Sequence, residues 1–314
     1  MPNFTTIVTE FLLLGFSDTQ ELQILYSLLF FLLYSAGLMG NLLIVILTTF
    51  DRRLHTTMYF FLRNLSIVDA CYISVTVPLA SFNSLVNNRV ISVSGCAAQI
   101  FLLIFLVYFE LTLLTVMAHD RYVAICHPLH YPVIMRPSVC MKMTLTCFVT
   151  GLFYSGFHTG YTFRLSFCQS NVIHQFFCDI PSLLKISCSE TFSNMLSLFA
   201  SALVIGAGCF AFIITSYSRI FSTVLKFPVK DDQRKAFSTC LPHIIVVSLF
   251  LFSIGFVYLQ PTSESGSIKD VIFSIFYSII PPLLNPIIYS LRNRHIKEAI
   301  RLVISRNLLL GNIA

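Results

Sequence analysis

The sequence predicts an all-α membrane protein, a seven-transmembrane-helix bundle with a short amphipathic C-terminal helix. The first observation behind this prediction is the composition, since 56% of the 314 residues are hydrophobic and only 11% are charged. A soluble domain carries about 25% charged residues, and so few charges cannot cover its surface. The second observation is a mean hydropathy of +0.81, and the third is the grouping of apolar residues into long runs. We therefore expect most of the chain to lie in lipid.

Seven segments are long and apolar enough to cross the hydrocarbon core, which takes about 20 residues in a helix. In chain order they are Leu22–Phe50, Thr57–Leu85, Ala97–Cys126, Met141–Tyr161, Asn194–Lys226, Arg234–Leu259 and Lys269–Leu291. Six spans would require dropping the fourth segment, which is rich in Ser and Thr, and eight would require adding the C-terminal stretch. A β-barrel would show segments of about 10 residues with alternating polarity, and the sequence has none. One domain is expected to fill 1–314, with an extracellular tail at 1–21, the helix bundle at 22–291 and a cytoplasmic tail at 292–314.

The placement of Lys and Arg predicts this orientation. With the N-terminus outside, nearly all of them fall at cytosolic ends and connections, as the positive-inside rule requires. The exceptions are Arg89, Arg164, Lys185 and Lys269. The net charge of +6 then indicates membrane orientation and not nucleic-acid binding. The sequon at Asn3 falls outside, where it can be glycosylated, and Met1–Gln20 lacks the basic start of a cleavable signal peptide.

The stretch Arg292–Arg306 has the pattern of an amphipathic helix. Ile296, Ile300 and Val303 share one face, and charged residues occupy another. Such a helix lies on the inner leaflet with its basic residues near anionic headgroups. The alternative is a disordered tail.

The ten cysteines divide into two groups by this topology. Four lie on the outer side, where disulfides form: Cys96, Cys168, Cys178 and Cys188. Four cysteines allow three pairings, and spacing alone does not choose among them. The other six lie in helices or on the cytosolic side, where a cysteine usually serves as a small buried apolar residue. The longest polar connection, Ser166–Thr191, carries three of the outer cysteines, so we expect disulfides to hold it over the mouth of the bundle.

The end of the third predicted helix carries a motif that points to a family. Met117–Cys126, followed by His127–Tyr131, closely resembles the signature of olfactory (odorant) receptors, a branch of the rhodopsin-like G-protein-coupled receptors. Further motifs of that family follow in order: Gly40-Asn41, Met58–Leu62, Asp69, Ser216-Tyr217, Lys235–Cys240 with His243, and Pro282 through Asn293. Three positions depart from the family pattern: Thr57 replaces a usual proline, Leu251 a common tyrosine, and Phe148 lies near a frequent tryptophan.

The resemblance implies that the chain binds a small-molecule odorant and activates a heterotrimeric G protein of the olfactory, stimulatory type, which raises cyclic AMP. It also implies a location in the plasma membrane, and the family pattern pairs Cys96 with Cys178 and Cys168 with Cys188. Nothing in the sequence indicates an enzyme, since it has no phosphate-binding Gly loop, no metal-spaced His/Cys cluster and no nucleophile beside a base. Two other classes stay open: a transporter or channel of unusual topology, and a receptor of the same fold for a peptide or lipid.

Asp69 and Glu110 are carboxylates within predicted spans, where such groups are costly and usually functional. In similar receptors the matching positions form a buried polar site near Asn41 and Asn285, which sometimes holds a sodium ion. Two neighbouring carboxylates are not both charged unless a cation lies between them. We therefore expect a proton on one of them or a bound Na⁺, and no other metal or cofactor. A pump or channel would use the same residues as an ion relay.

A conformational switch is expected near the cytosol. The residues assigned to it and to G-protein coupling are Asp120, Arg121, Tyr122, Tyr217, Asn285, Pro286 and Tyr289. Arg121 is always charged and can exchange Asp120 for a partner's carbonyl groups when the helices part. Pro286 has no N–H, so it interrupts the hydrogen bonds of the seventh helix and makes that helix bendable. The simpler alternatives are an interfacial arginine and a static kink.

Helical spacing also predicts a ligand pocket in the outer half of the bundle. Its residues are Ile104, Val107, Tyr108 and Leu111 on the third helix, Ser201, Ala202 and Ile205 on the fifth, Leu251, Ile254, Gly255 and Tyr258 on the sixth, and Ser274 and Ser278 on the seventh. Such a wall is apolar with a few hydroxyl groups, the usual build of a small-molecule site. The alternative is ordinary packing between helices.

Charged groups are absent from the sequence where charged ligands would need them. The outer half of the third helix has no acid for an amine, the middle of the seventh has no lysine for retinal, and no basic residue lies deep in the outer cavity. We therefore expect neutral, volatile, moderately hydrophobic ligands with an oxygen function.

Overall fold

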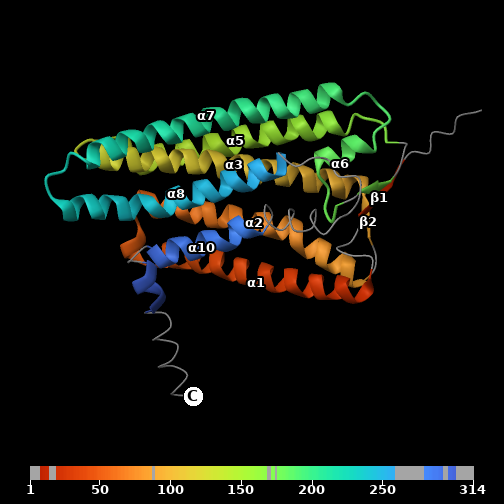
Figure 1. Cartoon of the computed structure of the whole chain (residues 1–314), viewed down its shortest axis with the longest axis horizontal. Coiled ribbons are helices and arrows are strands. Elements are labelled where there is room, and N and C mark those ends of the chain that lie inside the picture. The colour runs from red at the N-terminus through yellow and green to blue at the C-terminus, as the bar shows by residue number, and fades with distance from the viewer. Residues whose placement is uncertain are drawn as a thin grey trace, which may run out of the picture.

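The computed structural model describes residues 8–13, 19–86, 89–167, 171–173, 175–258, 279–292 and 296–301. Its long helices lie side by side in a bundle (Figure 1): α1 (Gln20–Phe50), α2 (Thr57–Val86), α3 (Val93–Cys126), α5 (Pro137–Thr162), α7 (Phe192–Val224), α8 (Lys230–Tyr258) and α10 (Ile280–Arg292). They follow the order of the seven predicted spans, so the predicted fold class is confirmed. For the seventh span the structure describes the cytosolic part, and 269–278 lie outside the described residues.

Five of the described helices, α1, α2, α3, α7 and α8, are long and apolar enough by themselves to cross a membrane. α5 is rich in Ser and Thr, the feature that made the fourth span the weakest in the sequence. Its hydroxyl groups bond within the helix, since Thr144 donates to the carbonyl of Cys140 at 3.0 Å and Thr162 to that of His158 at 2.8 Å. Such bonds let Ser and Thr lie in a membrane helix without an unpaired polar group.

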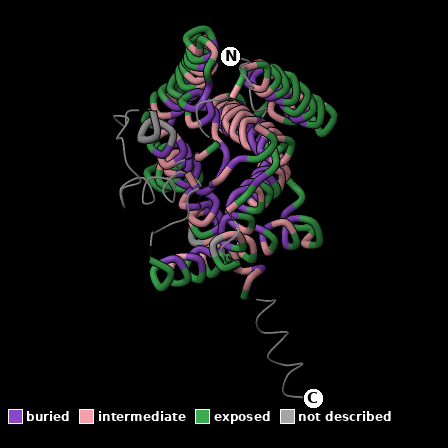
Figure 2. Tube along the Cα trace, turned by 90° about the vertical axis from the view of Figure 1, so that its right-hand side faces the viewer, coloured by how far each residue is buried: buried purple, intermediate pink, exposed green. Residues whose placement is uncertain are grey.

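The helices pack around α3, which contacts α2, α5, α7 and α8, while α1 packs on α2 and α10. Buried segments face the interior of the bundle and exposed segments face outward (Figure 2). The outward side chains are apolar: Leu203 and Val204 on α7 are 70% and 72% exposed, and Phe153 on α5 is 76% exposed. An apolar outer surface of this extent fits contact with lipid and not with water.

Two glycines permit close contacts that position the sites described below. A Cβ at Gly40 on α1 would lie 3.0 Å from Cγ of Pro286 on α10. A Cβ at Gly151 on α5 would lie 3.1 Å from the ring of Tyr108 and 3.2 Å from that of Phe105, both on α3. Any larger residue would push these helix pairs apart, so glycine sets the position of α10 against α1 and of α5 against α3.

A small sheet, which the sequence did not predict, joins the outer ends of the helices. β1 (Glu10–Leu13) lies between β2 (Val90–Ser92), which is antiparallel to it, and β3 (Val172–Ile173), which is parallel. Phe11 is fully buried, and its ring meets that of Phe167 edge to face with centroids 5.5 Å apart. Part of the segment expected as an N-terminal tail is therefore packed onto the two outer loops.

Short helices complete the connections: η1 (Arg52–Leu54), α4 (Tyr131–Ile134) and α6 (Ile180–Lys185). Residues 296–301 are also helical. In this last helix Ile296 and Ala299 are buried, whereas Lys297 and Arg301 are exposed, so its two faces differ as the sequence pattern predicts. The rest of the expected amphipathic helix, with Val303, lies outside the described residues.

Candidate functional site

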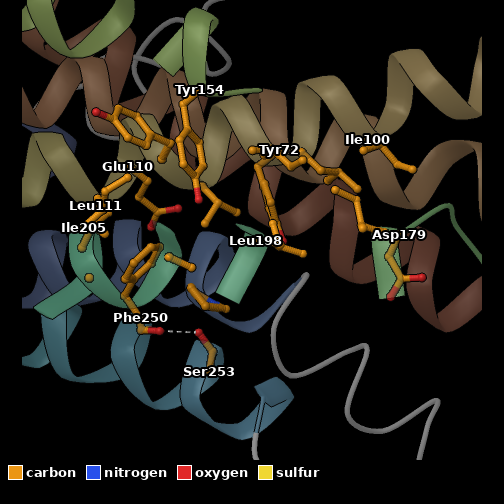
Figure 3. A pocket seen from close by; sticks show the side chains of 18 of the residues that line it. Tyr72, Ile100, Glu110, Leu111, Tyr154, Asp179, Leu198, Ile205, Phe250 and Ser253 are labelled. Carbon is orange, nitrogen blue, oxygen red and sulfur yellow. Dashed lines mark hydrogen bonds between the residues drawn. The ribbon is translucent and has the colours of Figure 1, made fainter. Parts of the chain in front are cut away.

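A cavity of about 280 Å³ lies in the outer half of the bundle, among α2, α3, α5, α7, α8 and α10 and below α6. Figure 3 shows side chains from several of these helices converging on it. The predicted residues on its wall are Ile104, Val107, Tyr108 and Leu111 of α3, Ala202 and Ile205 of α7, and Leu251 of α8. The structure thus brings together faces of three helices that the sequence had suggested separately.

Ser201 belongs to the predicted pocket but does not line this cavity. Its Oγ is turned toward α5, where it lies 3.0 Å from Nε2 of His158 and 3.2 Å from the hydroxyl of Tyr154. The side chains of Ile254, Gly255 and Tyr258, and the whole of Ser274 and Ser278, lie outside the described residues. Their place in a pocket stays a prediction.

Several wall residues were not among those predicted. Tyr72 of α2 and Tyr154 of α5 line the cavity, and so does Glu110 of α3, which had been assigned only to the sodium site. The segment Phe177–Pro181 lines the outer end of the cavity and forms its roof. Helical spacing gave no indication of this loop segment. The outer cysteines did indicate it, because disulfides were expected to hold the loop that carries Cys178 over the mouth of the bundle.

Two kinds of contact fix this roof. Cys96 and Cys178 form a disulfide with their Cα atoms 5.5 Å apart. The side chain of Gln99 adds two hydrogen bonds, accepting from the backbone N–H of Cys178 at 2.8 Å and donating to the carbonyl of Val75 at 2.9 Å. Cys188 is also disulfide-bonded, whereas Cys168, its expected partner, lies outside the described residues.

The described wall carries two acids and no Lys, Arg or His. Glu110 lies at the inner end of the cavity, beside Leu111 and Ile205 in Figure 3, and Asp179 lies at the outer end. Oδ1 of Asp179 accepts from the backbone N–H of Ser182 at 3.2 Å, which caps α6. Burial raises the pKa of Asp179, an effect that this hydrogen bond opposes. The wall therefore offers nothing that would attract an anion.

A buried polar cluster adjoins the inner end of the cavity. Asn285 donates to Oδ2 of Asp69 at 2.9 Å, and Asn41 donates to the carbonyl of Pro282 at 2.8 Å. Four buried oxygen atoms in this cluster have no hydrogen-bond partner among the described residues: Oδ1 of Asn41, Asp69 and Asn285, and Oε1 of Glu110. The structure thus brings together all four residues that the sequence assigned to a sodium site.

At the end of the bundle that the sequence predicts to face the cytosol, Arg121 forms an ion pair with Asp120. The hydroxyl of Tyr131, on α4, donates to the other carboxylate oxygen of Asp120 at 2.8 Å. Burial and the neighbouring charge of Asp120 raise the pKa of Tyr131 to about 12, so its hydroxyl keeps its proton at neutral pH. Asp120 therefore holds both Arg121 and the loop after α3.

The other predicted switch residues lie in separate contacts. The hydroxyl of Tyr217 on α7 lies 2.6 Å from Nδ1 of His243 on α8, and both side chains are buried. The hydroxyl of Tyr122 lies 3.1 Å from Nε2 of His127. The hydroxyl of Tyr289 is buried without a partner among the described residues. His243 had appeared in the sequence only as part of a motif, and its pairing with Tyr217 depends on the packing of α8 against α7.

Comparisons with known proteins agree with this arrangement. The family model described as olfactory receptor matches residues 30–307. The chain is 62% identical to olfactory receptor 14C36 of Homo sapiens over 98% of both chains, and 53% identical to olfactory receptor 14A16 of Homo sapiens over 96% of this chain and 98% of that one. The crystal structure of squid rhodopsin superposes with a TM-score of 0.73 at 16% identity, covering 93% of this chain and 88% of rhodopsin.

A seven-helix membrane bundle with a mostly apolar cavity towards one end and an arginine–carboxylate pair at the other fits the family match, and the chain is a rhodopsin-like G-protein-coupled receptor. Within that class, the chain belongs to the olfactory receptor family. It is a multi-pass membrane receptor and not an enzyme, and the family implies an odorant ligand and coupling to a G protein.

Proposed function

We propose that this receptor binds small, neutral, moderately hydrophobic volatile molecules in the cavity below α6. Binding activates a heterotrimeric G protein of the olfactory, stimulatory type and raises cyclic AMP, with the receptor in the plasma membrane and its N-terminus outside. The observation that carries the ligand chemistry is the cavity wall, which among the described residues is mostly apolar and has no basic side chain. Such a wall gains free energy from burying apolar surface and offers nothing to pair with an anion.

The cavity volume sets the size of the ligand. At about 280 Å³, the cavity lies at the small end of the range of about 300–1,000 Å³ that ligand pockets span. A cavity of this size suits a small volatile molecule. Peptides and long-chain lipids are far larger.

Activation requires that the ligand bind more tightly to a state in which the cytosolic ends are spread. In the state described here, Asp120 pairs with Arg121 beside it on α3, Tyr131 donates to Asp120, and the Tyr217–His243 contact joins α7 to α8. Separation of α8 from α7 would break the Tyr217–His243 contact, and the guanidinium of Arg121 becomes free once it leaves Asp120. That group can then donate to backbone carbonyls of the G protein.

The polar cluster supports a second part of the proposal, a site for Na⁺. Hard cations prefer oxygen ligands, and the four unpartnered oxygens of Asn41, Asp69, Glu110 and Asn285 fit such an ion. A bound Na⁺ would also compensate the negative charge of Asp69 and Glu110. Asp69→Asn should therefore weaken the Na⁺ sensitivity of signalling, and unchanged sensitivity would contradict the site.

The direct test of the ligand proposal is a cyclic-AMP screen of cells that express the full-length receptor against neutral odorants of seven to ten carbons. The wild-type receptor should respond to members of this set, and Arg121→Ala, at equal surface expression, should stay silent. A response confined to carboxylic acids or amines would show that the ligand class is wrong. An equal response to neutral odorants in cells that lack the receptor would also contradict the proposed ligand class.

A further inference from the structure

A cluster of polar side chains lies where α5 and α7 meet at the cavity wall. Oγ of Ser201 is within hydrogen-bond distance of three groups: the hydroxyl of Tyr154 at 3.2 Å, Nε2 of His158 at 3.0 Å and the backbone carbonyl of Leu198 at 3.1 Å. His158 is only 3% exposed, so the cluster is shielded from bulk solvent. Tyr154 lines the cavity, and Figure 3 shows its ring extending inward from α5.

With all three contacts of Ser201 formed as hydrogen bonds, the number of protons sets the direction of each one. The carbonyl of Leu198 can only accept, so the single hydroxyl proton of Ser201 goes to it. Oγ of Ser201 then accepts in its other two contacts, from the O–H of Tyr154 and from an N–H at Nε2 of His158. The one proton of Tyr154 is therefore used inside the protein. The oxygen of Tyr154 keeps its capacity to accept, and it is an acceptor only.

The neighbours of Tyr154 hold its ring in this position. The ring stacks on Tyr108 with centroids 5.0 Å apart and meets the ring of His158 edge to face at 4.5 Å. One turn earlier, Gly151 leaves the space that brings α5 onto the Tyr108 ring. Because the ring is held, Tyr154 can turn its proton toward a ligand only by giving up its hydrogen bond to Ser201.

We propose that Tyr154 is a specificity-determining residue whose oxygen accepts a hydrogen bond from the ligand. The receptor then prefers neutral ligands with a hydroxyl group, alcohols and phenols, to ketones and hydrocarbons of the same size. A ketone offers only an acceptor, so it gains no hydrogen bond from the oxygen of Tyr154, which is an acceptor as well. This inference rests on the proposed function, because it names the ligand class of the same cavity. One net hydrogen bond corresponds to a preference of about two- to tenfold.

The test uses matched sets in which an alcohol, a ketone and a hydrocarbon share one skeleton, such as 2-octanol, 2-octanone and 2-methyloctane, with cyclic sets of the same size. For the wild-type receptor, the half-maximal concentration for the alcohol should be about two- to tenfold lower than for the ketone. Tyr154→Phe keeps the ring and removes the oxygen, so the two should become equal. Ser201→Ala releases the proton of Tyr154 and lets it donate, so the response to the ketone should improve.

Two matched controls lie on the same helices and do not line the cavity: Tyr161→Phe on α5 and Ser193→Ala on α7. Both should keep the wild-type preference, with surface staining to confirm equal expression. An alcohol preference that persists in Tyr154→Phe, or a wild-type preference for ketones, would overturn the inference and leave the proposed function standing. A wild-type receptor that is silent to every set would overturn the proposed function, and this inference with it.

Discussion

Replacement of Gln99 by methionine should destabilise the receptor, because Gln99 ties the roof of the cavity to two helices. Its side chain accepts from the N–H of Cys178 and donates to the carbonyl of Val75. Gln99 is 5% exposed and Cys178 is fully buried, so the substitution leaves the buried N–H of Cys178 without this partner and removes a hydrogen bond from the partly buried carbonyl of Val75. The first change costs about 1–3 kcal/mol and the second about 0.5–1.5 kcal/mol, which together lower the free energy of unfolding by about 1.5–4.5 kcal/mol. Methionine has a similar volume, so little of the effect comes from a new cavity.

Thermal denaturation of the solubilised receptor measures this effect. The chain has no Trp, so we would follow unfolding with a thiol-reactive fluorophore, which reaches the buried free cysteines Cys140 and Cys240 when the bundle opens. A free-energy change of about 1 kcal/mol moves the melting midpoint of a large domain by about 2 °C, so the midpoint should fall by about 3–9 °C. Gln20→Met, at an exposed position, should change it by less than about 1 °C. If Gln99→Met shifts the midpoint no more than Gln20→Met does, the two hydrogen bonds do not hold the roof.

Two further substitutions test other parts of the structure. Tyr131→Phe removes the hydrogen bond to Asp120, which should destabilise the inactive state by about 1 kcal/mol relative to the active state. Ligand-independent cyclic AMP should then rise about fivefold. Basal cyclic AMP at the wild-type level would contradict this role of Tyr131. Phe11→Ala removes a fully buried ring from the outer sheet and should cost about 3–5 kcal/mol in the same thermal assay. Phe192→Ala, at a residue 67% exposed, is the control, and equal losses for the two would show that the N-terminal strand does not stabilise the fold.

The membrane spans could be predicted from the sequence because lipid acts on each segment separately. Every crossing helix must satisfy its own backbone and present apolar side chains, so composition and length suffice for most of them. α5 was the weakest prediction for a visible reason, since its Ser and Thr residues lower its hydropathy while bonding within the helix. The strand β1 was missed because four residues such as Glu10–Leu13 form a strand only when they pair with β2 and β3, which are far away in the sequence.

The prediction of the cavity was limited in the same way, by contacts between segments that are far apart in the sequence. Helical spacing selected the face of α3 that lines the cavity, because Ile104, Val107 and Tyr108 repeat on one side of one helix. It could not select Tyr154, whose position depends on Gly151 allowing α5 to approach α3. It also placed Ser201 in the pocket, whereas that hydroxyl turns to His158. These contacts depend on how two helices pack together, and a single sequence does not contain that information in a local pattern.

The central claim is that a ligand in the outer cavity opens the cytosolic end of the bundle. The most direct measurement is the distance between spin labels at Leu129, after α3, and Asp232, at the start of α8, both of which are exposed. With the most active alcohol from the matched sets, the distance should increase in the wild-type receptor and should not change without ligand. A distance that stays the same while that alcohol raises cyclic AMP would contradict the claim.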